Sequence, residues 1–274
     1  ALFGTAAALS IAAVALICLF LLANGVPAMA EIGLPEFLFG TTWRPVNDLY
    51  GIFPMIVGSL YVTAGAMIVG VPGGLLTALY FSRFARGRTG SFLRSGVELL
   101  AGIPSVVYGF FGLVIIVPFV RLLGPGTGLS VLAASLILGI MILPTVITVA
   151  QSALDAVPAR YYEGALALGV DHEHAVFKVV APAAASGIMA AIVLGLGRAI
   201  GETMAVVMVA GNMPIIPDSL LSGVRTMTAN IVLEMGYAAD LHREALIATG
   251  VVLFVFILLI TMLLNVIRKR GEAR

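Results

Sequence analysis

Six long apolar runs set the hydrophobic pattern of this chain, and polar segments separate them. A helix needs about 20 consecutive apolar residues to cross the hydrocarbon core of a bilayer, whereas the strands of a membrane barrel would alternate apolar and polar positions. We therefore predict an all-α membrane protein with a single domain over residues 1–274 and six transmembrane helices. The predicted spans are Ala6–Ala23, Met55–Phe81, Val97–Val120, Leu129–Ala150, Gly187–Ala210 and Ala245–Ile267.

Basic residues are distributed unequally between the two sets of loops that join these spans. The first set carries Arg83, Arg86, Arg88, Arg94, Arg160, Lys178, Arg268, Lys269, Arg270 and Arg274. The second set carries only Arg44, Arg121, Arg225 and Arg243. Cytoplasmic loops of membrane proteins hold an excess of Lys and Arg, so the first set of loops and both termini are predicted to be cytoplasmic.

Composition agrees with a membrane protein and excludes several functions. Hydrophobic residues make up 61% of the chain and charged residues 11%, whereas about 25% of a soluble chain is charged. The net charge of +1 leaves no basic face for nucleic acid. The single cysteine, Cys18, excludes disulfides and cysteine-ligated metal clusters. Because the chain begins at Ala1 rather than at a methionine, we expect the native start to be missing.

The segment Gln151–Pro182 lies on the predicted cytoplasmic side and mixes charged residues with apolar residues at helical spacing. Pro158 can begin a helix, Gly169 can end it, and Asp171 can cap the next helix. We expect a short helix–turn–helix with a free surface that inserts into a groove of a partner protein. An amphipathic connector that rests on the lipid headgroups is the alternative.

Five residues of this segment have the spacing of the EAA motif of ABC importer permeases, and they are Glu163, Gly164, Ala165, Gly169 and Pro182. Gly164 stands where the motif usually has a second alanine, and Ala181 where it has a leucine. The resemblance implies that the predicted coupling loop, residues 151–182, contains the coupling helix that docks on an ATPase subunit.

Arg198 and Glu202 are the only charged residues inside the fifth predicted span. A charge at the centre of a bilayer costs about 2.5–3.5 kcal/mol on the insertion scale, so such residues are functional by default. Their spacing of four residues would place both on one face of a helix, and Gly197 and Gly201 would let a neighbouring helix approach closely. Because guanidinium matches tetrahedral oxyanions, we predict an anion path at Arg198 and Glu202. A structural ion pair between these residues is the alternative.

Longer blocks of the chain resemble the PstC-type permease of phosphate-specific ABC importers. They are Phe39–Pro45, Glu98–Gly109, Met141–Thr145 and Gly195–Val206. The resemblance implies the MetI-like fold of type I ABC importer permeases, the bacterial cytoplasmic (inner) membrane as the location, and inorganic phosphate as the substrate. It also implies three partners, which are a homologous PstA-type permease, a PstB-type ATPase homodimer and a periplasmic PstS-type phosphate-binding protein.

Other residues are assigned smaller roles. Ser105 and Tyr108, beside Pro104, could add hydroxyls to the substrate path, and a hydrogen bond between helices would use them equally well. Trp43 and Tyr50 are interpreted as anchors at the membrane interface. We expect Thr228–Met235, an apolar patch interrupted by Glu234, to form a helix at the outer surface, and His172 and His174 to be solvated loop residues.

The sequence points away from an enzyme. It has no Gly-rich phosphate loop, paired catalytic carboxylates or metal-ligand motif, so a non-catalytic subunit without a cofactor, a catalytic site or a metal site is expected, with ATP hydrolysed by the partner ATPase. Two other transport functions stay open at this point. They are a permease for another oxyanion, such as sulfate or molybdate, and an anion transporter that works without ATP.

Overall fold

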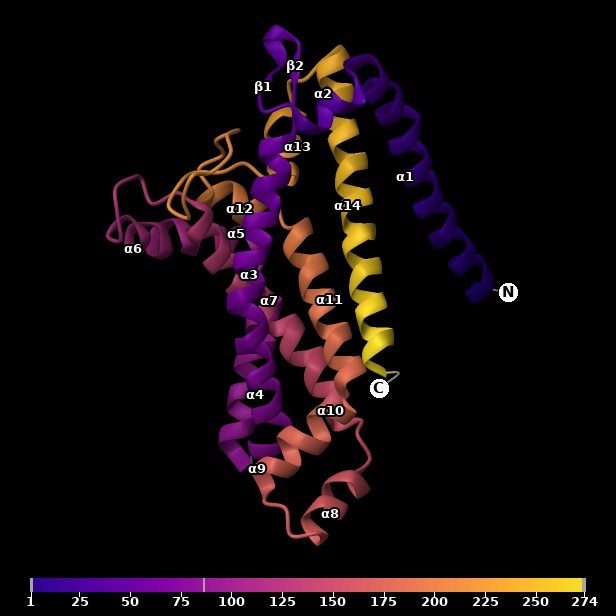
Figure 1. Cartoon of the computed structure of the whole chain (residues 1–274), viewed down its shortest axis with the longest axis vertical. Coiled ribbons are helices and arrows are strands. Elements are labelled where there is room, and N and C mark those ends of the chain that lie inside the picture. Colours follow the sequence, from indigo (N-terminus) through magenta and orange to yellow (C-terminus); the bar gives the residue numbers. More distant parts are fainter. Residues whose placement is uncertain (1, 86, 273–274) are drawn as a thin grey trace.

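Long helices form the body of the protein (Figure 1). The structure is a computed structural model and describes residues 2–85 and 87–272. Its long helices are α1 (Leu2–Ile32), α3 (Phe53–Leu79), α4 (Gly87–Gly102), α7 (Val131–Asp155), α11 (Ala185–Gly201) and α14 (Asp240–Glu272). A two-stranded antiparallel hairpin of β1 (Trp43–Arg44) and β2 (Leu49–Tyr50) lies at one end of the molecule, which we call the hairpin end.

Short helices connect or extend the long ones. Those near the hairpin end are α2 (Leu34–Phe39), η1 (Pro45–Asn47), α5 (Ser105–Phe111), η3 (Gly112–Ile116), α6 (Val117–Arg121), α12 (Met204–Val209) and α13 (Met227–Glu234). The others are η2 (Tyr80–Phe84), α8 (Ala159–Ala167), α9 (His172–Ala175), η4 (Val176–Val180) and α10 (Ala181–Ala183). Helix α8 lies at the opposite end of the molecule from the hairpin, and we call this the α8 end (Figure 1).

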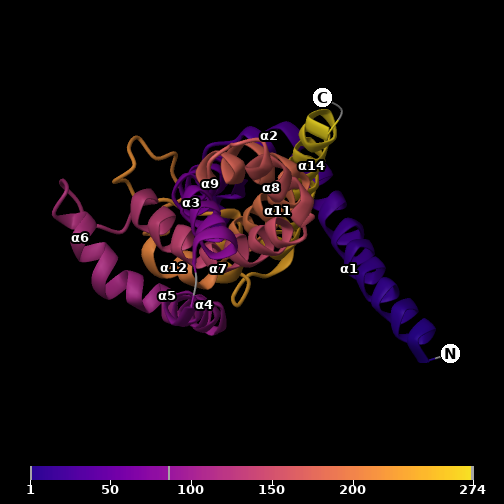
Figure 2. The same ribbon diagram turned by 90° about the horizontal axis from the view of Figure 1, so that it is seen from below.

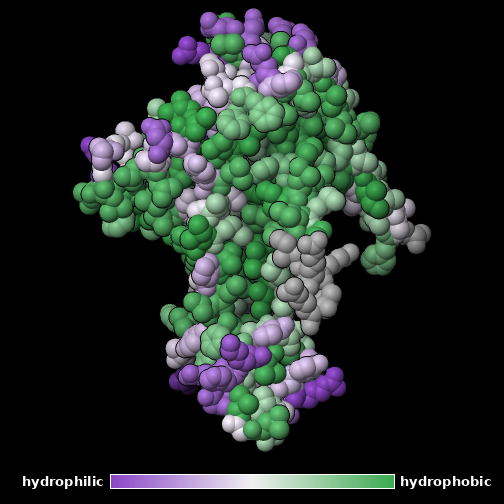
Figure 3. All heavy atoms as spheres, in the orientation of Figure 1, coloured by the Kyte–Doolittle hydropathy of each residue, from purple (hydrophilic) through white to green (hydrophobic). Residues whose placement is uncertain are grey.

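The lengths and compositions of the helices fit a protein that crosses a membrane several times. Among the described residues, four helices are long and apolar enough to cross by themselves, and the number rises to six when each of two bent helix pairs is one span. The hydropathy of the surface agrees, because hydrophobic residues cover its middle and hydrophilic residues gather at both ends (Figure 3). The predicted multi-pass helical fold is therefore confirmed.

Two of the predicted spans are not continuous helices. The third predicted span, Val97–Val120, bends sharply at Pro104, where the helices on either side of Ile103 and Pro104 meet at 100°. Proline lacks a backbone N–H, and it also disfavours helical backbone at the preceding residue. The fifth prediction, Gly187–Ala210, is interrupted after Gly201, where two residues separate α11 from α12.

Helix α7 lies at the centre of the bundle and packs against α3 and α11. Small residues allow the close approach of α3 to α7. A Cβ atom at Gly70 would lie 2.7 Å from the carbonyl oxygen of Gly139, a distance that a side chain does not tolerate. Many residues of α7 are buried, so this helix forms the packed centre of the bundle beside which the site is built.

Helix α1 stands apart from the central bundle and contacts mainly α14 (Figures 1 and 2). The contact is closest at Gly25, where a Cβ atom would lie 2.7 Å from Cγ2 of Val251. Most of the other side chains of α1 are exposed. The orientation of the termini in the membrane stays a prediction, and of the basic residues counted for it, Arg86, Arg274 and the side chains of residues 268–270 lie outside the described part of the chain.

Candidate functional site

Arg198 lies near the end of α11 and reaches α7. Its Nη1 atom donates a hydrogen bond of 3.2 Å to Oγ1 of Thr145. Thr145 is ten residues before the end of α7 at Asp155, which corresponds to about 15 Å along a helix. The guanidinium therefore lies near the middle of the central span, and its side chain is exposed in the single chain.

Glu202 does not pair with Arg198, so the expectation that both lie on one helix face within reach of each other is wrong, as is the alternative of a structural ion pair. The reason is local backbone geometry, because α11 ends at Gly201 and Glu202 is extended, with φ −69° and ψ 135°. The spacing of four residues brings side chains together only while a helix continues. Oε1 of Glu202 instead accepts a hydrogen bond of 3.2 Å from the backbone N–H of Ala205, which satisfies a donor in the first turn of α12.

The interruption between α11 and α12 is also held from outside the helix. Oγ1 of Thr228, on α13, donates a hydrogen bond of 3.1 Å to the carbonyl oxygen of Glu202. The side chain of Glu202 and the hydroxyl of Thr228 thus satisfy backbone groups that a continuous helix would have paired internally. In a membrane such groups must find a partner within the protein.

Arg198 consequently has no carboxylate within ion-pair distance among the residues that the structure describes. Gly197 and Gly201 flank it, and within the described residues no atom of another packed element lies within 4 Å of a Cβ built on either glycine. Close approaches of α11 to α7 occur instead at Gly187, against Ala153, and at Gly195, where a Cβ would lie 2.8 Å from Val146. The face that carries Arg198 is therefore open and positively charged.

The two hydroxyl residues beside Pro104 occupy different positions. The Tyr108 side chain is buried, and its hydroxyl donates a hydrogen bond of 2.7 Å to the carbonyl oxygen of Leu100. This bond joins α5 to α4 across the 100° bend, so the donor of Tyr108 serves the helix contact. Ser105 begins α5 and is partly exposed.

The predicted helix–turn–helix is present at the α8 end. Glu163 and Gly164 are exposed on α8, while Ala165 is buried beneath them. Gly169 has φ +82°, which favours glycine and ends the helix. Asp171 caps α9 by accepting a hydrogen bond of 2.7 Å from the backbone N–H of His174, and this bond lowers the pKa of the Asp171 carboxyl.

Pro182 and His172 complete this segment. Pro182 is exposed in the first turn of α10. His172 begins α9, and its Nδ1 atom lies 2.7 Å from the hydroxyl oxygen of Tyr162 on α8. Its ring also meets Phe84, with 4.7 Å between ring centroids. The expectation of a solvated loop residue is therefore wrong for His172, because an aromatic cluster partly buries it.

The same cluster ties the helix–turn–helix to the long helices. Arg83, at the end of η2, donates a hydrogen bond of 2.8 Å to the carbonyl oxygen of Leu154 on α7. The Cζ atom of Arg83 also lies 5.9 Å from the centroid of the Tyr162 ring. Arg83 therefore connects α8 to η2, which continues α3, and to the end of α7.

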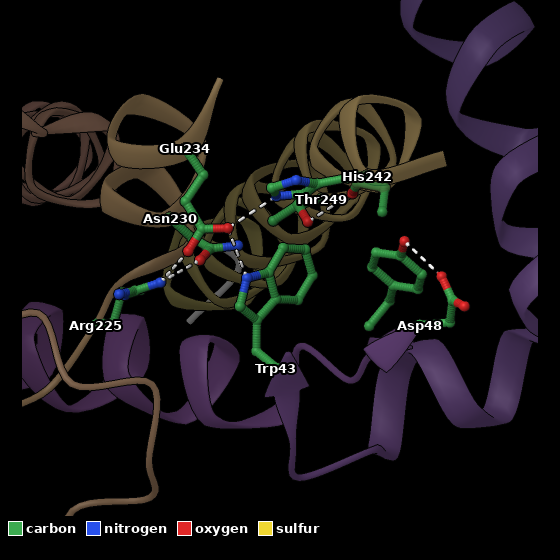
Figure 4. Close-up of polar contacts among 9 residues, drawn as sticks. Trp43, Asp48, Arg225, Asn230, Glu234, His242 and Thr249 are labelled. Carbon is green, nitrogen blue, oxygen red and sulfur yellow. Dashed lines mark hydrogen bonds and ion pairs between the residues drawn. The ribbon is translucent and has the colours of Figure 1, made fainter. Parts of the chain in front are cut away.

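A second polar cluster, at the hairpin end, was missed by sequence reasoning (Figure 4). The buried Glu234 carboxylate accepts hydrogen bonds from Nη1 of Arg225 at 2.6 Å and from Nε1 of Trp43 at 2.9 Å. Its Oε2 atom also lies 2.9 Å from Nε2 of His242. Trp43 and Tyr50 are both buried and pack edge to face, so their interpretation as interfacial anchors is wrong. The expected helix in this region is confirmed by α13.

Comparison with known proteins assigns the chain to a family. Residues 70–272 match the family described as binding-protein-dependent transport system inner membrane component. The probable ABC transporter permease protein YqgH of Bacillus subtilis is 37% identical over 97% of this chain and 88% of its own length. The phosphate transport system permease protein PstC of Mesorhizobium japonicum is 33% identical over 94% of this chain and 85% of its own length.

Solved structures agree on the fold. A chain of the MetNI methionine ABC transporter in an inward-facing conformation matches with a TM-score of 0.63 and 20% identity, over 84% of this chain and 99% of that one. The match confirms the predicted MetI-like permease fold. The chain therefore belongs to the family of binding-protein-dependent transport system inner membrane components, which are non-catalytic permease subunits of ABC transporters.

Proposed function

We propose that this chain is the permease subunit of an ATP-driven importer that moves inorganic phosphate into the cytoplasm across the bacterial cytoplasmic membrane. The observation that carries the proposal is the exposed Arg198 guanidinium, which has no carboxylate partner among the described residues at mid-span. Relatives similar over most of the chain are named phosphate permeases, which supports phosphate as the anion.

The chemistry of Arg198 suits a tetrahedral oxyanion. Guanidinium presents planar N–H donors that bind two oxygens of such an anion together. Thr145 fixes the direction of the group through a single hydrogen bond of 3.2 Å, and the other N–H donors stay available to a ligand. Because Glu202 is engaged at the start of α12, it does not neutralise the positive charge that attracts the anion.

Transport requires partners that supply energy and complete the path. We assign ATP hydrolysis to a PstB-type ATPase dimer that docks on the exposed Glu163 and Gly164 of α8. A homologous PstA-type permease would cover the open face around Gly197 and Gly201, and a PstS-type binding protein would deliver phosphate at the hairpin end. In this scheme the chain binds no cofactor of its own.

The contacts at the α8 end suggest how ATP hydrolysis could be coupled to movement of the anion through the membrane. Closure of the ATPase dimer moves α8, and Tyr162 and His172 pass this movement to Phe84 and Arg83 in η2, which continues α3. Arg83 also holds the end of α7, the helix that carries Thr145. Reorientation of α7 therefore shifts the position of Arg198 between the two sides of the membrane.

The test is uptake of labelled phosphate by the reconstituted complex with Arg198→Ala and Arg198→Lys. We expect Arg198→Ala to abolish uptake, while copurification with the ATPase and insertion stay normal. Arg198→Lys keeps the charge but loses the planar pair of donors, so intermediate uptake is expected. Full uptake by Arg198→Ala would refute the proposal.

A further inference from the structure

An open cavity of about 230 Å³ lies between α4 and α7, on the α8 side of the Arg198 site. Five polar residues line it, and they are Arg94, Glu98, Thr148, Gln151 and Ser152. Pockets for drug-sized ligands measure about 300–1,000 Å³, so this cavity suits a smaller ligand. None of these residues belongs to the site described above.

Two α7 residues that line the cavity share a helix face with Thr145, the residue that Arg198 contacts. Thr145, Thr148 and Ser152 are spaced three and four residues apart, which places them on the same face of the helix. Thr148 lies about 4.5 Å further along the helix axis than Thr145, toward the α8 end. An anion that moves from Arg198 toward the α8 end would pass along this face of α7.

Arg94 supplies a fixed positive charge to the cavity. Its Nη2 atom donates a hydrogen bond to the carbonyl oxygen of Phe81, and its Cζ atom lies 5.9 Å from the centroid of the Phe81 ring. These contacts hold the guanidinium in place but occupy only one of its five N–H donors. The remaining N–H donors of Arg94 can bind an anion at little cost in conformational entropy, because the side chain is already ordered before binding.

Glu98 gives the cavity an acceptor that is unusual for an anion site. It lies four residues after Arg94 on the same helix, yet within the described residues no ion pair joins the two. A carboxylate repels an anion that carries no proton, but it accepts a hydrogen bond from one that does. At neutral pH phosphate retains at least one proton and sulfate retains none, so Glu98 distinguishes these two anions.

We propose that this cavity is an exit site for a protonated oxyanion, with Arg94 binding its charge, Glu98 accepting its proton and Thr148 donating a hydroxyl. The proposal rests on the proposed function, since it adds a second phosphate-binding site to the transport path that contains Arg198. It adds a selective step on the cytoplasmic side.

Protection of an introduced cysteine tests occupancy of the cavity directly. The assembled complex would carry Cys18→Ser and Gln151→Cys, at a lining position to which the proposal assigns no contact with the anion. It would be labelled in inside-out membrane vesicles with a membrane-impermeant maleimide. Inorganic phosphate should slow the labelling several-fold, whereas sulfate at the same concentration should not. The matched control is Ser95→Cys, an exposed position of α4 that does not line the cavity, and its labelling should not respond to phosphate.

A second variant tests the selective role of Glu98. With Glu98→Gln added to the cysteine variant, sulfate should protect as well as phosphate does, because the repelling charge is gone. Absence of labelling at Gln151→Cys, absence of phosphate protection, or equal protection by sulfate with Glu98 intact would overturn the exit site. Phosphate uptake by the unmodified complex is measured in parallel, so that normal uptake without protection refutes only the exit site, while absent uptake refutes the proposed function.

Discussion

The indole N–H of Trp43 donates a hydrogen bond of 2.9 Å to the carboxylate of Glu234, which lies 191 residues later in the sequence. This bond joins the β1–β2 hairpin to α13, and His242 on α14 contacts the same carboxylate. The hairpin end is therefore held together by one buried acidic group.

Removal of the Glu234 charge should loosen the hairpin end. Hydrogen bonds to charged groups contribute about 1.5–3 kcal/mol each, and Glu234→Gln weakens those from Trp43 and Arg225. We expect a loss of stability of about that size, measured as a lower melting temperature of the purified protein in detergent. Glu244→Gln, at an exposed position of α14, is the control and should leave the melting temperature unchanged.

The role of Glu202 can be separated from that of an ion-pair partner. Glutamine keeps the Oε1 acceptor that receives the N–H of Ala205, so Glu202→Gln should retain most phosphate uptake. Glu202→Ala leaves that N–H unsatisfied and should reduce uptake strongly. Uptake assays on the two variants side by side check this, and equal loss in both would show that the charge of Glu202, rather than its cap, matters.

Packing of α1 on α14 depends on one glycine. Gly25→Val would force a side chain against Val251, and overpacking of this kind costs about 1–3 kcal/mol. Gly4→Val, on the same helix but with no atom within 4 Å, is the control. We expect a lower melting temperature for Gly25→Val only, and an equal effect of both variants would contradict the observed α1–α14 contact.

The cap at Asp171 should matter for coupling. Because its pKa is lowered from 3.8 by the His174 N–H, its contribution to stability is fully present above the ordinary value and is lost only as the pH falls through the lower folded value. Asp171→Ala should uncouple ATP hydrolysis from uptake, seen as less phosphate moved per ATP. Asp171→Asn retains a capping oxygen and should behave like the unmodified protein. Normal coupling in Asp171→Ala would contradict this assignment.

The sequence predicted the elements that depend on residues close together in the chain. It missed the features that depend on contacts between residues far apart in the chain. The apolar runs revealed the spans, and Pro158, Gly169 and Asp171 bounded the short helices, since each acts on its own backbone. At the interruption after Gly201 the carbonyl oxygen of Glu202 is bound by Thr228, a partner that helical spacing does not reveal. The spacing of Arg198 and Glu202 therefore suggested an ion pair that the backbone does not allow.

Local sequence patterns also could not predict that Glu234 is buried and binds residues of other segments. A charge within an apolar patch was visible in the sequence, but its partners Trp43 and Arg225 lie on separate segments. Likewise, hydropathy detects a run that is long enough to cross a membrane and does not detect a bend of 100° at Pro104.

The most direct test of the account is uptake of labelled phosphate into proteoliposomes that contain this permease, its homologous partner permease and the ATPase, together with the binding protein. We expect uptake only when ATP and the binding protein are both present, with no reduction by excess sulfate. Uptake that proceeds without ATP, or that sulfate suppresses strongly, would contradict an ATP-driven phosphate importer.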